Sequence, residues 1–196
     1  GDDGHAALEK RNLAWQSGGL FRTPDLIAAF EKFMAEREVF TETERAHYLH
    51  VGKLVLERYG KETEHERPII HSAERALSVH LGDIPLFGKV DRIDLFTPNG
   101  RRCRIIDYKT GKPYRTETAV RKEGNLFRQL VFYKLLCDRA PGFLHEATHF
   151  TLDFVGNEQS GRSVIEFEIN AKETQDLPQI VRAVWGKLTA FDFTPM

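Results

Sequence analysis

The fold is decided by the stretch Ile-Pro-Leu-Phe-Gly-Lys-Val-Asp-Arg-Ile-Asp-Leu-Phe at residues 84–96 and by Arg-Cys-Arg-Ile-Ile-Asp-Tyr-Lys at residues 102–109. Both segments are rich in residues that favour strands, and Pro98-Asn99-Gly100 between them is typical of a turn. Upstream, apolar residues alternate with polar ones over residues 77–81, and Gly82-Asp83 forms another turn. The three segments together predict an antiparallel meander.

Helices are expected on both sides of this meander, with two more strands near the end of the chain. Thr23-Pro24-Asp25 is a helix start, because proline is tolerated in a first turn. Thr43 is a candidate N-cap, and Pro178 is expected to break the last helix early. The predicted helices cover residues 6–15, 23 onward, 41–59, 116–139 and 171–190, and the further strands cover 148–155 and 164–169. This order predicts an α/β or α+β three-layer domain, with 1–66 mainly helical and 67–196 holding the sheet core and its flanking helices.

Length and composition fit one globular domain spanning 1–196, with 41% hydrophobic and 29% charged residues. No apolar run approaches the roughly 20 residues needed to cross a bilayer, and no secretory signal is visible. Cys103 and Cys137 are too few and too far apart for a disulfide framework, so we expect buried thiols and a cytoplasmic location without a membrane partner. Because the chain begins with Gly, we expect an excised or processed fragment.

Charge is balanced overall but not locally. The net charge of −1 argues against a protein that coats nucleic acid nonspecifically. Residues 101–122 nevertheless hold eight basic residues against two acidic ones: Arg101, Arg102, Arg104, Lys109, Lys112, Arg115, Arg121 and Lys122 against Asp107 and Glu117. This excess is either a basic patch for a nucleic acid or a solvated loop.

Asp107 and Lys109 are the first candidates for chemistry. Residues two apart on a strand share a face, so the carboxylate and the ammonium point the same way. A carboxylate suits a hard cation such as Mg²⁺, and a neighbouring Lys can act on water and stabilise charge on a phosphate. The Tyr108 carbonyl between them is a further possible oxygen ligand. The alternative is a salt bridge at a strand end.

Asp91 lies on the preceding strand and can converge with Asp107 on one ion, because adjacent strands are about 4.8 Å apart. Asp94, three residues further on, faces the other side of the sheet. Strand geometry alone does not choose between these two aspartates, and an Arg92–Asp94 pair on an edge strand is the plainer interpretation of the segment.

Gln129 and Tyr133 lie four residues apart on a predicted helix and therefore share a face. An amide placed among apolar neighbours needs a partner if it is buried. That partner is either the strand that carries Asp107 or a substrate backbone, and the alternative is an exposed glutamine on the helix surface.

Together, G-x-x-D-R-x-D at 88–94, I-I-D-Y-K-T-G at 105–111 and Q-x-x-x-Y at 129–133 resemble the RecB-type branch of the PD-(D/E)xK nuclease superfamily. The branch includes nuclease domains of RecB- and AddB-like helicase–nucleases and domains fused to UvrD-like helicases. The resemblance implies a restriction-endonuclease-like core with a central mixed sheet, and hydrolysis of DNA with Mg²⁺ or Mn²⁺. It also implies an exonuclease module with a helicase domain or subunit as partner.

The family carries an earlier helical G-x-x-x-H motif whose His binds metal, and Gly1 to His5 matches it. A Glu on the strand before G-x-x-D-R-x-D is also common, and Glu74 is the candidate, with a surface strand residue as the alternative. By resemblance, the metal ligands are His5, Asp91, Asp107 and the Tyr108 carbonyl, the catalytic residues are Asp91, Asp107 and Lys109, and the substrate-positioning residues are Gln129 and Tyr133.

Some relatives hold an iron–sulfur cluster on four cysteines, and this chain does not support one. Two other functions stay open: a catalytically inactive nuclease-like domain that binds DNA or scaffolds a repair complex, and an unrelated α+β enzyme.

Overall fold

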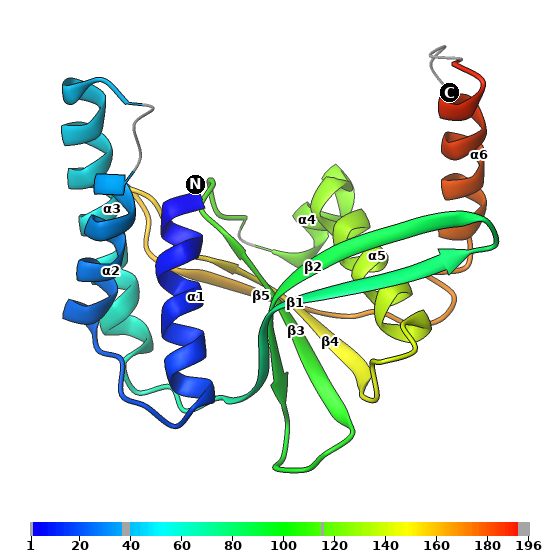
Figure 1. Cartoon of the computed structure of the whole chain (residues 1–196), viewed down its shortest axis with the longest axis horizontal. Coiled ribbons are helices and arrows are strands. Elements are labelled where there is room, and N and C mark those ends of the chain that lie inside the picture. Colours follow the sequence, from blue (N-terminus) through cyan, green and yellow to red (C-terminus); the bar gives the residue numbers. More distant parts are fainter. Residues whose placement is uncertain (1, 37–39, 115, 192–196) are drawn as a thin grey trace.

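The computed structural model describes residues 2–36, 40–114 and 116–191. Three helices come first, a sheet follows, and helices flank it on the second side (Figure 1). The elements are α1 Asp2–Gln16, α2 Thr23–Glu36, α3 Glu42–Thr63, β1 Ile69–Leu81, β2 Ile84–Leu95, β3 Arg102–Lys109, α4 Glu117–Glu123, α5 Asn125–Arg139, β4 Glu146–Phe154, β5 Ser163–Glu168 and α6 Leu177–Thr189. None of the helices in these ranges is long and apolar enough to cross a membrane.

The sheet has the order β1-β2-β3-β4-β5, so β3 is its central strand. The pairs β1–β2 and β2–β3 are antiparallel, which confirms the predicted meander, and the β4–β5 pair is antiparallel as well. The β3–β4 pair is parallel, because helices α4 and α5 carry the chain back across the sheet before β4 begins. The result is the expected mixed sheet with flanking helices.

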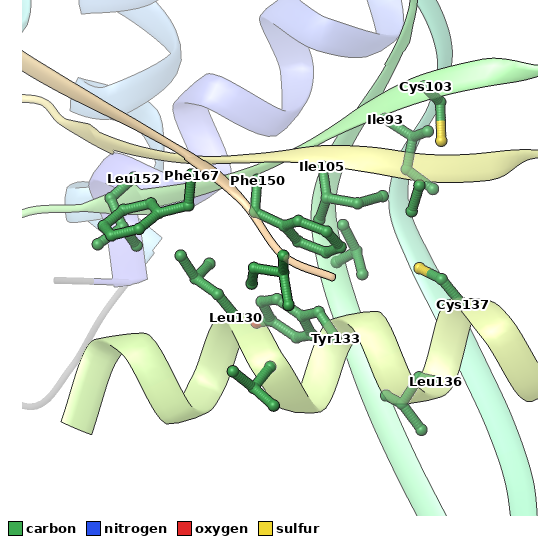
Figure 2. Close-up of a cluster of buried hydrophobic side chains, with 14 of the residues drawn as sticks. Ile93, Cys103, Ile105, Leu130, Tyr133, Leu136, Cys137, Phe150, Leu152 and Phe167 are labelled. Carbon is green, nitrogen blue, oxygen red and sulfur yellow. The ribbon is translucent and has the colours of Figure 1, made fainter. Parts of the chain in front are cut away.

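Each face of the sheet carries its own hydrophobic core. Figure 2 shows side chains of β2, β3, β4 and β5 meeting α5, among them Ile105 and Phe150 from the sheet and Leu130 and Leu136 from the helix. On the opposite face, Tyr108 and its neighbours pack with α1, α2 and α3. Successive residues of β3 therefore point into different layers, as strand alternation requires. Cys103 and Cys137 are buried free thiols in the α5-side core, as expected.

Strand β1 is longer than the alternation over residues 77–81 predicts, since it begins at Ile69. Its first half is irregular: the register with β2 shifts between Ile70 and Ser72, and Glu74 has a φ of +51°. The regular 2-residue hydrophobic period is lost there, and so the strand signal is lost too. Glu74 does lie on the strand before the G-x-x-D-R-x-D segment, where it forms an ion pair with Lys89.

Three predicted helix features are wrong. The helix expected over 116–139 is two helices, because Gly124 adopts a φ of +85° and ends α4. The final helix begins at Leu177 rather than 171, and Pro178 stands in its first turn and does not break it. Thr41, not Thr43, caps α3, in a capping box with Glu44.

Gly88 is required by packing. A Cβ at this position would lie 2.5 Å from the Leu136 side chain and 3.9 Å from the ring of Tyr133. The missing side chain lets α5 approach the backbone of β2 closely, which sets the distance between the helix and the strand that carries Asp91.

Candidate active site

The end of β3 holds a chain of hydrogen bonds that joins the central strand to α5. Asp107 and Lys109 point to the same face, with Lys109 Nζ 2.5 Å from Asp107 Oδ2. Gln129 accepts a hydrogen bond from Lys109 Nζ at 2.9 Å and donates one to Asp107 Oδ1 at 3.0 Å. The Tyr133 hydroxyl donates to the same Asp107 oxygen at 3.0 Å. The two helix residues thus contact both groups of the D-x-K pair, and the active-site strand is one of the two partners predicted for Gln129.

Asp91 lies where β2 and β3 separate. The ladder between these strands runs from Leu95–Cys103 to Arg92–Ile106 and stops before Asp91. The Tyr108 backbone N–H donates instead to Asp91 Oδ2 at 2.7 Å. This carboxylate therefore takes the place of a ladder carbonyl and is fixed beside the Asp107–Lys109 segment.

His5 completes the group from the N-terminal helix. Its Nδ1 lies 3.8 Å from Asp91 Oδ2, and its ring meets the ring of Tyr108 edge-on at 6.4 Å between centroids. Gly1, the other residue of the G-x-x-x-H match, lies outside the described residues. Burial lowers the pKa of His5, although the charge of Asp107 opposes this shift. A lowered pKa favours the neutral imidazole, the form that can bind a metal.

Burial and a neighbouring carboxylate together perturb Asp91. Burial first, and then the charge of Asp107, raise the pKa of Asp91 from 3.8 to about 7. Burial, followed by the charges of Asp107 and Asp91, also raises the pKa of Tyr133, so its hydroxyl stays a hydrogen-bond donor. Such shifts arise where groups of like charge converge away from water, and they are frequent at functional sites.

The second aspartate of the motif, Asp94, lies on the opposite face. It forms an ion pair with Arg92 at 2.8 Å, and both side chains are buried. Arg92 also donates to the Tyr108 hydroxyl at 2.8 Å, and that hydroxyl donates to Asn12 of α1 at 3.2 Å. The Arg92–Asp94 pair and the convergence of Asp91 with Asp107 therefore exist together, one on each face of the sheet.

The role of Arg92 and Asn12 in holding Tyr108 was missed by reasoning from the sequence. Arg92 and Asp94 are two residues apart and share one face of the sheet. Tyr108 directly follows Asp107, so the Tyr108 side chain points to the face opposite Asp107, which is the face that carries Arg92. The strand spacing therefore indicates that Tyr108 and Arg92 lie on the same side of the sheet. Nothing in the sequence points to Asn12, which is 96 residues away from Tyr108.

The basic patch is reduced by pairing within the chain. Arg104 pairs with Glu166, and Arg121 pairs with Glu117 and Glu173. Lys112 is exposed on the loop after β3, and Arg115 lies outside the described residues. Arg101 and Arg102 are exposed at the opposite end of β3, so the charge excess read from the sequence does not gather beside Lys109.

The side chains gathered at the end of β3 include two carboxylates and an imidazole, which are groups that can bind a divalent cation. Within the described part of the chain, no three His, Cys, Asp or Glu side chains converge tightly enough to hold an ion on their own. Mg²⁺ commonly uses one or two carboxylates and completes its shell with water and substrate phosphate. Burial, and then the charge of Asp107, raise the pKa of Asp91, and the His5 imidazole lies beside this carboxylate. These residues fit a hard divalent cation that is shared with water and substrate.

The fold and this arrangement together define a nuclease class: a mixed sheet whose central strand ends in Asp-x-Lys, with a second aspartate on the neighbouring strand. The family profile described as the PD-(D/E)XK nuclease superfamily matches residues 1–196, and the chain belongs to this superfamily. Members typically use a divalent metal.

Among solved structures, the chain is similar to a candidate exonuclease from Eubacterium rectale, with a TM-score of 0.51 and 12% sequence identity. The alignment covers 97% of this chain and 70% of that one. At this identity the likeness shows the shared fold. A comparison with curated proteins gave no match. The place of this chain in the RecB-type branch stays a prediction from its motifs.

Proposed function

We propose that this protein is a divalent-metal-dependent deoxyribonuclease that hydrolyses phosphodiester bonds at the end of β3. The observation that carries the proposal is the joint placement of Asp91, Asp107 and Lys109, with Lys109 held by Gln129 at 2.9 Å. An isolated strand-end salt bridge has no need of a second buried carboxylate or of an amide that bridges both of its partners.

His5, Asp91, Asp107 and the Tyr108 carbonyl would hold the ion, Mg²⁺ or Mn²⁺. A divalent cation in such a site supplies Lewis acidity, which activates water and stabilises charge that develops on the phosphate. Asp91 accepts a hydrogen bond from the Tyr108 N–H, which holds the peptide unit between Asp107 and Tyr108, next to the Tyr108 carbonyl.

Lys109 would act on the attacking water and on the phosphate. Its ammonium carries three donors, and in this structure it contacts Asp107 and Gln129. The Gln129 amide orients Lys109 on one side and Asp107 on the other, because its oxygen accepts from the first and its nitrogen donates to the second. Tyr133 holds Asp107 from the same helix.

We propose more specifically that the protein is an exonuclease module of a RecB-like or UvrD-like helicase–nuclease. It is supported by the motifs quoted above and by the likeness to a candidate exonuclease. Attachment to a helicase and a cytoplasmic location stay predictions from the sequence.

The test is cleavage of end-labelled single- and double-stranded DNA with Mg²⁺, with Mn²⁺ and with EDTA. We expect metal-dependent cleavage that Asp107→Asn and Lys109→Ala each reduce by at least about 100-fold, as is usual when a catalytic group is lost. Asp83→Asn, in the exposed β1–β2 turn, is the matched control and should cleave normally. If the wild-type chain binds DNA but leaves it intact with either metal, it is an inactive nuclease-like binding domain and the proposal fails.

A further inference from the structure

A pocket of about 440 Å³ lies beside the proposed active site, between the three N-terminal helices and the ends of β3 and β4. These helices stand side by side against one face of the sheet (Figure 1). Gly4 and Thr110 line the pocket, and they directly adjoin His5 and Lys109 in the chain. A Cβ on Gly4 would lie 3.8 Å from the Thr110 side chain, so α1 and the loop after β3 meet here. Two residues of the pocket wall are thus direct chain neighbours of residues proposed to act in DNA cleavage.

The mouth of the pocket is aromatic. Tyr48 of α3 is 49% exposed, and its ring lies 5.3 Å from the ring of Phe40. Phe30 of α2 forms a buried part of the wall. Gly52 makes room for this ring, since a Cβ there would lie 2.2 Å from it. The wall nearest the sheet is more polar, with Thr110 and Asn157.

These features suit a flat, partly polar aromatic group. The volume falls in the range of about 300–1,000 Å³ that is typical of small-molecule pockets, where apolar walls combine with a few polar groups. Nucleobases stack on exposed aromatic rings in proteins that bind single strands, and base edges need polar partners. The exposed cation Lys112, two residues beyond Thr110, supplies charge complementary to a phosphate backbone at the same loop.

Resting on the proposed nuclease function, we propose that this pocket binds an unpaired nucleobase of the DNA strand engaged at Asp107 and Lys109. A base within a duplex is stacked and paired, and can enter such a pocket only after it is flipped out. The pocket therefore makes the protein prefer single-stranded DNA or frayed ends to intact duplex.

Binding is measured without cleavage, by fluorescence anisotropy in EDTA, with short single-stranded and blunt duplex oligonucleotides. We expect Tyr48→Ala to weaken single-strand binding by about 5- to 150-fold, the range found when a stacking aromatic is removed. Tyr48→Phe keeps the ring and should bind as the wild type does. Trp185→Ala is the matched control, because Trp185 is a comparably exposed aromatic on α6, on the other side of the molecule from α1–α3 (Figure 1).

A second measurement needs no variant. Oligonucleotides with one abasic position, moved stepwise along the strand, should bind the wild-type protein less tightly at one position only. That loss should disappear in Tyr48→Ala. Equal binding of all abasic oligonucleotides, or unchanged single-strand affinity in Tyr48→Ala, would overturn the proposal. These binding assays contain no metal. A failure to cleave DNA in the nuclease assay would therefore contradict the proposed nuclease function without deciding whether the pocket binds a base.

Discussion

Asp91→Asn should stabilise the metal-free protein while it removes activity. Burial and the charge of Asp107 raise the pKa of Asp91 from 3.8 to about 7. Each pKa unit corresponds to ~1.4 kcal/mol, so roughly three units make the ionised carboxylate destabilising by up to ~4 kcal/mol in the fold. Asparagine carries no charge, and its side-chain oxygen can still accept the hydrogen bond that the Tyr108 N–H gives Asp91 at 2.7 Å.

The destabilisation caused by the ionised Asp91 carboxylate increases with pH. The pKa of Asp91 is higher in the folded state than in the unfolded state, so the folded state binds the proton more tightly. The destabilisation is therefore absent below about pH 4, grows between about pH 4 and 7, and is complete at higher pH. The advantage of Asp91→Asn should follow the same course, and saturating Mg²⁺ should cancel it, because an ion that binds the native carboxylates stabilises the wild type.

The assay is urea unfolding followed by circular dichroism in EDTA, at pH 5 and pH 8. At pH 8 we expect a gain of about 2–4 kcal/mol for Asp91→Asn, and a much smaller gain at pH 5. For a domain of this size, each kcal/mol also raises the melting temperature by roughly 2–4 °C. Asp83→Asn, which removes an exposed carboxylate, should show no such difference. An Asp91→Asn protein less stable than the wild type at pH 8 would refute the electrostatic reasoning.

Three further substitutions test the framework of the site. Arg92→Met leaves buried Asp94 without its cation and should reduce the free energy of unfolding by about 3–5 kcal/mol, measured by urea unfolding; a loss below 1 kcal/mol would mean that the pair is dispensable. Tyr133→Phe removes one hydrogen bond to Asp107 and should alter stability by only ~1 kcal/mol while it lowers kcat with little change in KM; unchanged kcat would show that Tyr133 does not position Asp107. Gly88→Ala forces a methyl group against Leu136 at 2.5 Å and should destabilise by ~1–3 kcal/mol, so an unaltered melting temperature would contradict the close packing of α5 on β2.

The meander and the shared face of Asp107 and Lys109 could be predicted because both depend on local alternation and turn residues. The start of β1 at Ile69 could not be predicted, since a bulge and the positive φ of Glu74 interrupt the alternation of its first half. The break at Gly124 was missed because α4 and α5 have compatible hydrophobic patterns, and only the left-handed backbone of the glycine separates them.

At the site, sequence geometry left Asp91 and Asp94 as alternatives, and the family resemblance selected Asp91. The structure places Asp91 against the Tyr108 N–H and Asp94 against Arg92. The difference depends on where β2 and β3 stop pairing, which is a property of the assembled sheet and leaves no trace in the spacing of the two aspartates.

Asp107 and Tyr108 are consecutive residues, yet one is held by α5 and the other by α1 through Asn12. The two helical layers therefore hold neighbouring residues of β3 from opposite faces of the sheet, and both fix the position of the peptide between them. A chimera that takes its α1–α3 layer from another family member would disturb the chemistry even with every catalytic residue kept. Such a chimera has to keep Asn12, Arg92 and Tyr108 together, because the hydrogen bonds among these three side chains hold Tyr108 in place.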